Sequence, residues 1–228
     1  MSLPHNHRLT EILVCILVAA FIGFLADTAS PFVPSPEEAL EHILGDRIIL
    51  DKEALHERFE ADKSSLERMY HYGYDTIVTK HSRRAGLDWR LVASLICQES
   101  AFQAAAIAAR RYHGLMQISS IAARIFNIED LLDPDSNVEV GTRYLRYLTD
   151  IYMKEGMDSV NAVKFALAAY NCGPDKLQHL RDSARTTSGI RTDNWETFAG
   201  LPINSDWTTV KYVTGILDRY EEFKIITR

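Results

Sequence analysis

A carboxylate on the apolar face of a helix is the feature of this sequence with the clearest chemical meaning. The segment 88–100 has helical periodicity, and Glu99 follows Leu95 and Ile96 at helical spacing, so it continues their apolar face. Burial without a cation raises the pKa of a carboxyl group, and a carboxyl that keeps its proton near neutral pH is the general acid that glycosidic-bond cleavage needs. The alternative is that Glu99 marks the polar end of a core helix.

Three short motifs follow Glu99-Ser100 along the chain. They are Gly114-Leu-Met-Gln-Ile118, Ala168-Ala-Tyr-Asn-Cys-Gly-Pro174 and Thr209-Val-Lys-Tyr-Val213. The order Glu-Ser, Gly-Leu-Met-Gln, Ala-Tyr-Asn-x-Gly and a late Tyr-Val resembles the lytic transglycosylases of the soluble-transglycosylase type, the goose-lysozyme-like SLT domain of glycoside hydrolase family 23. Each motif alone is weak, so the resemblance depends on all four occurring in order.

This resemblance covers roughly residues 75–223, and the stretch 131–145 is also similar to the family's link between its second and third motifs. It implies a lysozyme-like helical domain, and helical spacing with few period-two patterns independently indicates a mainly α chain. The activity it implies is that of a peptidoglycan lytic transglycosylase, a carbon-oxygen lyase. Such an enzyme cleaves the β-1,4 bond between N-acetylmuramic acid and N-acetylglucosamine and leaves 1,6-anhydro-N-acetylmuramic acid ends.

By the same resemblance Glu99 is the sole catalytic acid/base. It would protonate the glycosidic oxygen and then accept the proton of the muramic C6 hydroxyl, which attacks within the same sugar. Many glycosidases use two carboxylates, but no second acid accompanies the motifs here. That pattern fits assistance by the sugar's own N-acetyl group. No cofactor or metal is expected.

Three polar residues of the motifs are candidates for substrate binding. Ser100 has a hydroxyl for a sugar or for the carboxyl, although a hydroxyl at a helix end also bonds backbone. Gln117 and Asn171 each carry an amide with both donor and acceptor, which suits an acetamido sugar. Asn171 also has a structural interpretation, because asparagine before glycine is common at helix C-termini.

Three apolar or aromatic residues complete the candidate set. Met116 and Tyr170 offer surfaces to a sugar ring, and core packing is the alternative for both. Tyr212 matches the late family tyrosine, which the resemblance places in a hydrogen bond to the catalytic carboxyl. Without the resemblance, Tyr212 is interpreted as a packing residue of the last helix.

The segment after Glu99 departs from the family pattern. Asn-Pro is replaced by Gln103-Ala104, the expected serine is Ala108, and the expected glycine is Arg111. A side chain at a positive-φ position would shift the backbone. Because the segment keeps its length, we expect altered subsites rather than a lost acid. Arg110 and Arg111 would either meet substrate carboxylates or form a solvated basic turn.

Bulk composition excludes several classes of protein. The 228 residues are 46% hydrophobic and carry a net charge of −6 without a Lys/Arg run, which argues against a nucleic-acid surface. The three cysteines, Cys15, Cys97 and Cys172, lack metal-ligand spacing. Cys97 and Cys172 flank motif residues, so the alternatives are a disulfide in an oxidising compartment and two unpaired packing residues.

The N-terminus predicts export. Residues 12–26 are an uninterrupted apolar run, so residues 1–30 are interpreted as a signal peptide or an uncleaved signal-anchor. Residues 31–72 would form a Pro-rich spacer and a helical arm, and residues 73–228 the lysozyme-like domain. We therefore expect a periplasmic or otherwise external location in the cell envelope. The expected partners are glycan strands, the membrane if the segment is uncleaved, and other cell-wall proteins.

Capping and periodicity predict the helices that position the motifs. Helices are expected over 75–85, from Asp88 through Glu99, over 137–155, from a Ser159 cap to 171, and over 207–223. The Thr/Ser/Asn-rich stretch 181–206 is expected to be a loop that walls a groove.

The sequence leaves two alternative functions open. One is a hydrolytic lysozyme or chitinase on the same fold, which product chemistry distinguishes from a lyase. The other is a non-catalytic glycan-binding protein of the envelope, against which the Glu99, Gln117, Asn171 and Tyr212 set argues.

Overall fold

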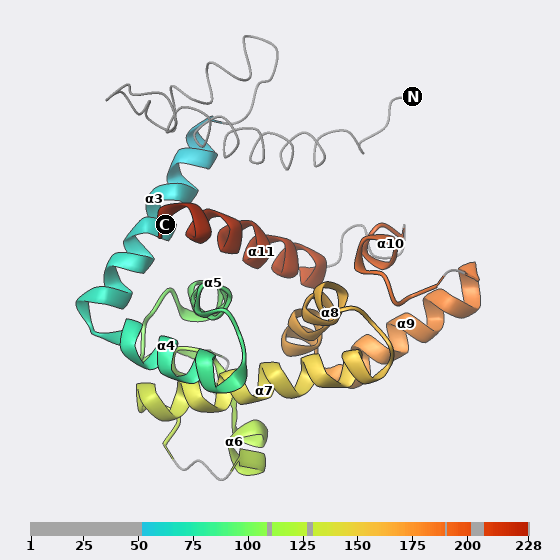
Figure 1. Cartoon of the computed structure of the whole chain (residues 1–228), viewed down its shortest axis with the longest axis horizontal. Coiled ribbons are helices and arrows are strands. Elements are labelled where there is room, and N and C mark those ends of the chain that lie inside the picture. The colour runs from blue at the N-terminus through green and yellow to red at the C-terminus, as the bar shows by residue number, and fades with distance from the viewer. Residues whose placement is uncertain (1–51, 109–110, 127–129, 190, 202–207, 228) are drawn as a thin grey trace. The chain divides into compact units, whose positions relative to one another are not determined.

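The computed structural model describes residues 52–108, 111–126, 130–189, 191–201 and 208–227 (Figure 1). Contacts divide the chain into a unit that ends at Glu60 and a unit of Ala61–Arg228, and all the candidate site residues belong to the second. The predicted signal segment and the Pro-rich spacer lie outside the described residues. Among the helices that are described, none is long and apolar enough to span a membrane.

The described part of the chain is mainly helical, which confirms the predicted fold class. Its elements in chain order are α3 (Lys52–His71), α4 (Tyr74–Ala85), α5 (Trp89–Ser100), β1 (Ile107–Ala108), β2 (Tyr112–His113), β3 (Ile118–Ser119), α6 (Ser120–Phe126), α7 (Pro134–Lys154), α8 (Ser159–Cys172), α9 (Pro174–Ser188), α10 (Trp195–Ala199) and α11 (Thr208–Ile226). The three short strands pair antiparallel in the order β1-β2-β3. In this small sheet His113 pairs with Ile107 on one side and Ile118 on the other.

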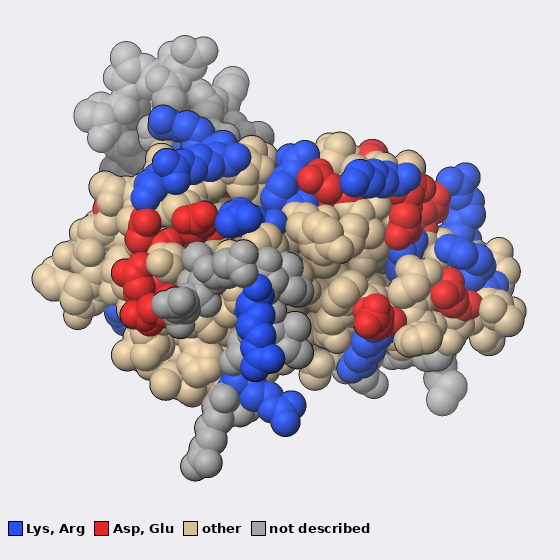
Figure 2. Space-filling model, turned by 90° about the horizontal axis from the view of Figure 1, so that it is seen from below, with Lys and Arg blue, Asp and Glu red and all other residues tan. Residues whose placement is uncertain are grey.

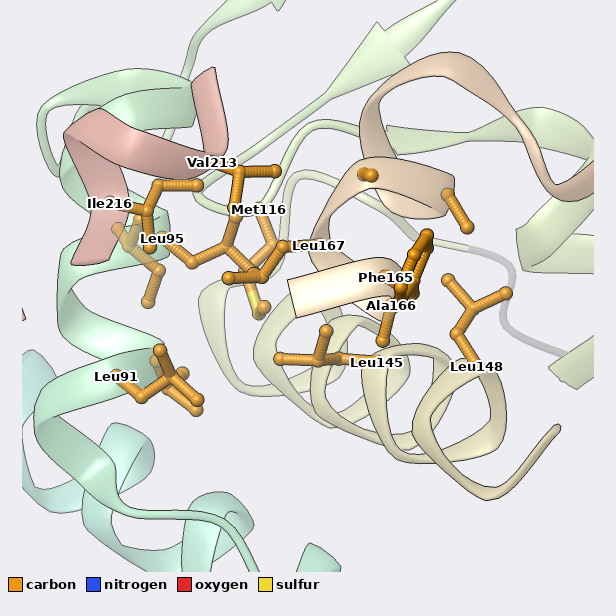
Figure 3. Close-up of a cluster of buried hydrophobic side chains, with 14 of the residues drawn as sticks. Leu91, Leu95, Met116, Leu145, Leu148, Phe165, Ala166, Leu167, Val213 and Ile216 are labelled. Carbon is orange, nitrogen blue, oxygen red and sulfur yellow. The ribbon is translucent and has the colours of Figure 1, made fainter. Parts of the chain in front are cut away.

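Two helices that carry motif residues lie at the centre of this unit. α5 packs against α4 and α11, and α8 packs against α7, α9 and α11. Figure 1 shows α11 along one side of α5 and α8, with α7 along the other. The core between them is continuous, and Leu95, Leu145, Leu167 and Val213 bring side chains into it from four helices (Figure 3).

Caps explain where the helices begin, and two starts differ from the prediction. α7 begins at Pro134 rather than Asn137, because the Asp133 side chain accepts the backbone N–H of Ser136 and proline suits the first helical position. α8 is capped by Asp158 rather than Ser159, since the Asp158 carboxylate accepts the N–H groups of residues 160 and 161.

The prediction of a loop over residues 181–206 is wrong for much of that stretch. α9 continues to Ser188 and α10 forms over Trp195–Ala199. Leu177, Arg181 and Ala184 are buried at helical spacing along α9, so an arginine occupies the middle of its buried stripe. Composition suggested a loop because the polar residues of α9 conceal this stripe.

Charges on the molecular surface are mixed. Figure 2 shows Lys and Arg interspersed with Asp and Glu over the face in view, with broad areas of other residues between them. Both signs of charge are present on this face, and over the whole chain acidic residues outnumber basic ones, 31 to 25.

Candidate active site

Helix α5 holds Glu99 in its last turn. The Asp88 side chain caps the start of this helix by accepting the backbone N–H of Arg90 at 2.9 Å. The helix ends at Ala101, which is left-handed at φ 48° and whose N–H bonds the Cys97 carbonyl. A second contact holds the start of α5, because the Tyr220 hydroxyl donates to Asp88 at 3.1 Å.

The Glu99 carboxyl lies in an environment that favours its protonated form. Burial raises its pKa to about 7, and a hydrogen bond from the Tyr212 hydroxyl opposes that rise. A neutral donor replaces the cation that normally accompanies a buried carboxylate. Near neutral pH the group is therefore divided between its acid and base forms, as a residue that first donates and then accepts a proton requires.

Two tyrosines face Glu99 from different helices. Tyr212 comes from α11, and Tyr170 from α8 donates its hydroxyl to the Met116 carbonyl at 2.8 Å. Burial raises the pKa of both phenols, and the nearby Glu99 carboxylate raises them further. Both tyrosines therefore stay protonated and act as hydrogen-bond donors. The ring of Tyr144, on α7, packs tilted against that of Tyr170 at 5.5 Å.

The Gly114–Gln117 turn packs against the end of α5. The Ser100 hydroxyl donates to the Leu115 carbonyl at 2.7 Å, so in this structure Ser100 joins the two motifs. Gln117 is left-handed at φ 48°, and its Nε2 donates to the carbonyls of Gly114 and Ala106 at 2.8 and 3.1 Å. These bonds orient the Gln117 amide.

The other end of the Gln117 amide is unsatisfied. Its Oε1 is buried and has no hydrogen-bond partner among the described residues. Because buried polar atoms are nearly always paired, this unpaired oxygen is an exception among the described side chains.

The Met116 side chain packs in the core, unlike the Gln117 side chain, which bonds the backbone of the turn. Its side chain is fully buried and lies with Leu95, Leu167 and Val213 in the core (Figure 3). A Cβ built at Gly141 would lie 2.3 Å from the Met116 sulfur, so the side chain occupies space that only glycine leaves open. Toward Tyr170 it presents its backbone carbonyl, and contact with a sugar ring stays a prediction.

Asn171 lies in the last turn of α8 and is exposed. Its Oδ1 accepts the Thr209 hydroxyl at 2.7 Å, which ties the end of α8 to the start of α11. The described contacts bring Ser100, Met116, Gln117 and Tyr170 together around one turn and Tyr212 onto Glu99. They give Asn171 no direct contact with Glu99.

Asn137 is a supporting residue that the sequence analysis missed. It is fully buried on α7, where its Oδ1 accepts the Met116 N–H and its Nδ2 donates to the carbonyls of His113 and Leu131, all at 2.8 Å. A Cβ at Gly114 would lie 2.3 Å from this Nδ2. The signal was an asparagine inside the apolar stripe of the stretch 131–145.

The sequence left two questions open, the state of the two cysteines and the effect of the arginine at position 111. Cys97 and Cys172 are both free thiols, so geometry decides against the disulfide, and burial raises the pKa of Cys97 to about 12. The N–H of Arg111 bonds the Ala108 carbonyl at 3.1 Å, between β1 and β2, and its side chain is exposed. Arg110 lies outside the described residues.

A separate hollow of about 280 Å³ contains none of these residues. It is lined by Glu155, Met157, Arg181, Arg185, Arg191, Thr192 and Asp193. Its most buried charge, Arg181, is paired with Glu155, and Arg191 is paired with Asp193. This hollow therefore carries little uncompensated charge.

Comparison with known families identifies the domain. The family model described as Transglycosylase SLT domain matches residues 76–191. The chain belongs to this family. Glu99, Gln117 and Asn171 lie within the matched part of the SLT domain, whereas Tyr212 lies beyond it.

Relatives and solved structures agree with this assignment. Membrane-bound lytic murein transglycosylase F from Histophilus somni (strain 129Pt) is 32% identical over 173 residues, which cover 70% of this chain and 34% of the relative. The protein of the same name from Pseudomonas fluorescens (strain Pf0-1) is 31% identical over 122 residues, covering 54% of this chain and 25% of that one. The SLT chain therefore spans about a third or less of these relatives.

Solved structures show the fold. The 70 kDa soluble lytic transglycosylase from Escherichia coli matches with a TM-score of 0.51 and 24% identity, over 67% of this chain and 24% of that one. The lytic transglycosylase Slt from Pseudomonas aeruginosa matches with a TM-score of 0.51 and 22% identity, over 67% and 23%. These likenesses confirm the lysozyme-like fold expected from the sequence.

Proposed function

We propose that this chain is a peptidoglycan lytic transglycosylase in which Glu99 is the catalytic acid and base. The observation that carries the proposal is the partly buried carboxyl with a pKa of about 7 and a tyrosine as its partner, within an SLT domain. The names of the relatives, lytic murein transglycosylases, support murein as the substrate.

The reaction proceeds in two proton transfers at one carboxyl. Protonated Glu99 donates to the glycosidic oxygen between N-acetylmuramic acid and N-acetylglucosamine, and the bond to the leaving sugar breaks. The Glu99 carboxylate then accepts the proton of the muramic C6 hydroxyl, whose oxygen attacks the anomeric carbon and closes the 1,6-anhydro ring. The Tyr212 hydrogen bond supports the first step, because it stabilises the ionised carboxyl that proton donation leaves behind.

The remaining site residues hold the substrate. The unpaired Oε1 of Gln117 accepts an N–H of the substrate, such as that of an acetamido group. The exposed amide of Asn171 contacts the sugar from the end of α8, and the turn at Met116 and Tyr170 forms the floor beneath it. Ser100 keeps that turn against Glu99.

We also propose a location in the cell envelope. The relatives carry the words membrane-bound in their names, and residues 12–26 are apolar enough to direct export or anchoring. The glycan strand is then the principal partner.

Product analysis tests the proposal. Purified peptidoglycan is digested with the full-length chain and with Glu99→Gln, and the products are weighed by mass spectrometry. We expect anhydromuropeptides from the parent and a loss on the order of 10²–10⁴ in rate for the variant. Products heavier by one water molecule would instead indicate a hydrolase, and no products from a folded parent would favour a glycan-binding protein.

A further inference from the structure

Two helices outside the SLT match, which covers residues 76–191, contact the structures around Glu99: α11 packs on α5, and α3 reaches α11 and the backbone after α5 through side chains. α11 supplies Tyr212 to the site. α3 contributes no candidate site residue, yet two of its side chains reach the structures that hold Glu99 in place.

The first structure is the pairing of α11 with α5. At the C-terminal end of α5, Glu99 meets Tyr212. Nearer the start of α5, Arg219 Nη1 donates to the carbonyl of Ser94, five residues before Glu99, at 3.4 Å, and it also donates to the Gln98 side chain Oε1 at 3.5 Å. Because residue numbers rise on one helix as they fall on the other, the helices are antiparallel. The contacts of Arg219 therefore fix the alignment of α11 along α5, and this alignment places the Tyr212 hydroxyl next to Glu99.

Asp62 of α3 holds that arginine. Its Oδ1 accepts Arg219 Nε at 2.7 Å, and the two side chains are only 7% and 13% exposed. Asp62 Oδ2 is buried without a partner among the described residues, so desolvation offsets much of the attraction within the pair. Such an incompletely satisfied ion pair adds little to stability, and its main contribution is to fix the register of α11 on α5. Arg219 follows Tyr212 by seven residues, which places both on the same face of α11.

The second structure is the backbone that follows Glu99. Ala101 and Phe102 both have positive φ, at 48° and 58°, in a region that non-glycine residues rarely occupy. Arg68 of α3 donates from Nη1 to the Ala101 carbonyl. A charge-assisted bond at this carbonyl stabilises a strained helix end two residues beyond the catalytic carboxyl.

We propose that α3 is a positioning element of the active site, in which Asp62 sets the register of α11 on α5 and Arg68 holds the strained end of α5. Together they keep Tyr212 hydrogen-bonded to Glu99. The inference rests on the proposed function in taking Glu99 as the acid, and it places part of the active-site support outside the SLT match.

The sign of one pKa change distinguishes this mechanism from simple charge effects. The titratable groups that face Glu99 are Tyr212 from α11 and Tyr170 from α8. Replacing Asp62 with Asn removes a negative charge, which by direct electrostatics lowers the pKa of Glu99. Loosening the Tyr212 hydrogen bond raises it, because that bond favours the ionised carboxyl. An increase therefore reports lost positioning.

The experiment measures the pKa of Glu99 by carbon NMR of the full-length chain labelled at glutamate carboxyls, with Glu99→Gln to assign the signal. We expect Tyr212→Phe to raise this pKa, and Asp62→Asn to raise it by a smaller amount, about half a pH unit. In the Tyr212→Phe background Asp62→Asn should no longer raise it, because the bond that it supports is absent. Glu67→Gln, an exposed charge removal on the same helix, is the matched control and should leave it unchanged.

A lowered or unchanged pKa in Asp62→Asn, or the same increase with and without the Tyr212 hydroxyl, would overturn the proposal. This readout needs no turnover, so it is separate from a failure of the proposed activity. Arg68 gives a second test: Arg68→Met should lower kcat about tenfold with little change in KM, and Arg68→Lys should restore most of it. Equal losses in both variants would contradict the role of Arg68.

Discussion

Two charged side chains in this domain, the partly buried Glu99 and the fully buried Arg181, have opposite surroundings. Glu99 has a neutral tyrosine as its hydrogen-bond partner, and burial raises its pKa to about 7. Arg181 is 2% exposed but fully partnered; its contacts are Glu155 at 2.8 Å, Gln178 at 3.0 Å, the Thr192 carbonyl at 3.2 Å, and the rings of Tyr152 and Phe165. A buried charge with complete partners stabilises the fold, whereas one without them can change its protonation state and do chemistry.

The largest effect on stability is expected at the fully partnered charge. Arg181→Ala removes the ion pair and the ring contacts, so we expect the unfolding free energy to fall by about 3 kcal/mol, at the low end for buried pairs because Glu155 is partly exposed. Urea denaturation measures it. Arg185→Ala, on the same helix but exposed, is the control and should change stability little. Activity per folded molecule should be unaffected, and its loss in Arg181→Ala would undermine the distinction between the two charges.

Glu99→Gln should have the opposite effect on stability. The pKa of Glu99 rises from 4.5 to about 7 on folding, so between these pH values the folded state holds a proton that the unfolded state has lost. The unfolding free energy of the parent therefore falls as pH rises through this window, and the variant lacks that decrease. At pH 8 the variant should be more stable by up to about 3 kcal/mol, and below about pH 4 the two should agree. Parallel pH profiles of the two melting temperatures would contradict this.

The activity of the parent should decline as pH rises through about 7, because the first step needs protonated Glu99. Tyr212→Phe removes the hydrogen bond that lowers this pKa, so the alkaline limb of the kcat profile should move to higher pH while the maximum rate falls. Initial rates on peptidoglycan across pH 5–9 measure both, and an unmoved limb in the variant would show that Tyr212 does not tune the acid.

The Cys97 thiol, two residues before Glu99, should react slowly in the folded chain. Because burial raises the pKa of Cys97 to about 12, its alkylation at pH 8 should be slower in the folded chain than in the unfolded chain by on the order of 10²–10³. Peptide mass spectrometry reads the modification at Cys97 and Cys172 separately. An intact disulfide between them in non-reduced protein would contradict the structure.

Local sequence predicted much of the fold because caps and apolar periodicity act over a few residues. The helix from Asp88 through Glu99 and the end of α4 at Gly86 follow from such signals. α9 did not, since its buried stripe includes Arg181, and an arginine is recognised as a core residue only when its partners from other elements are known. The role of Asn137 was missed for the same reason, because its three partners lie in β2, in the turn that follows β2 and in the segment before α7.

The sequence by itself determined the motifs, their order and the presence of a carboxyl on an apolar helix face, because these are properties of residue type and spacing. Only the tertiary structure decided what surrounds that carboxyl. The Tyr212 hydroxyl lies 113 positions from Glu99 in the chain, the Gln117 acceptor is unpaired only because its other end is held, and Asp62 reaches Arg219 across 157 positions. Burial and long-range contacts set the pKa of Glu99, and neither exists until the helices pack.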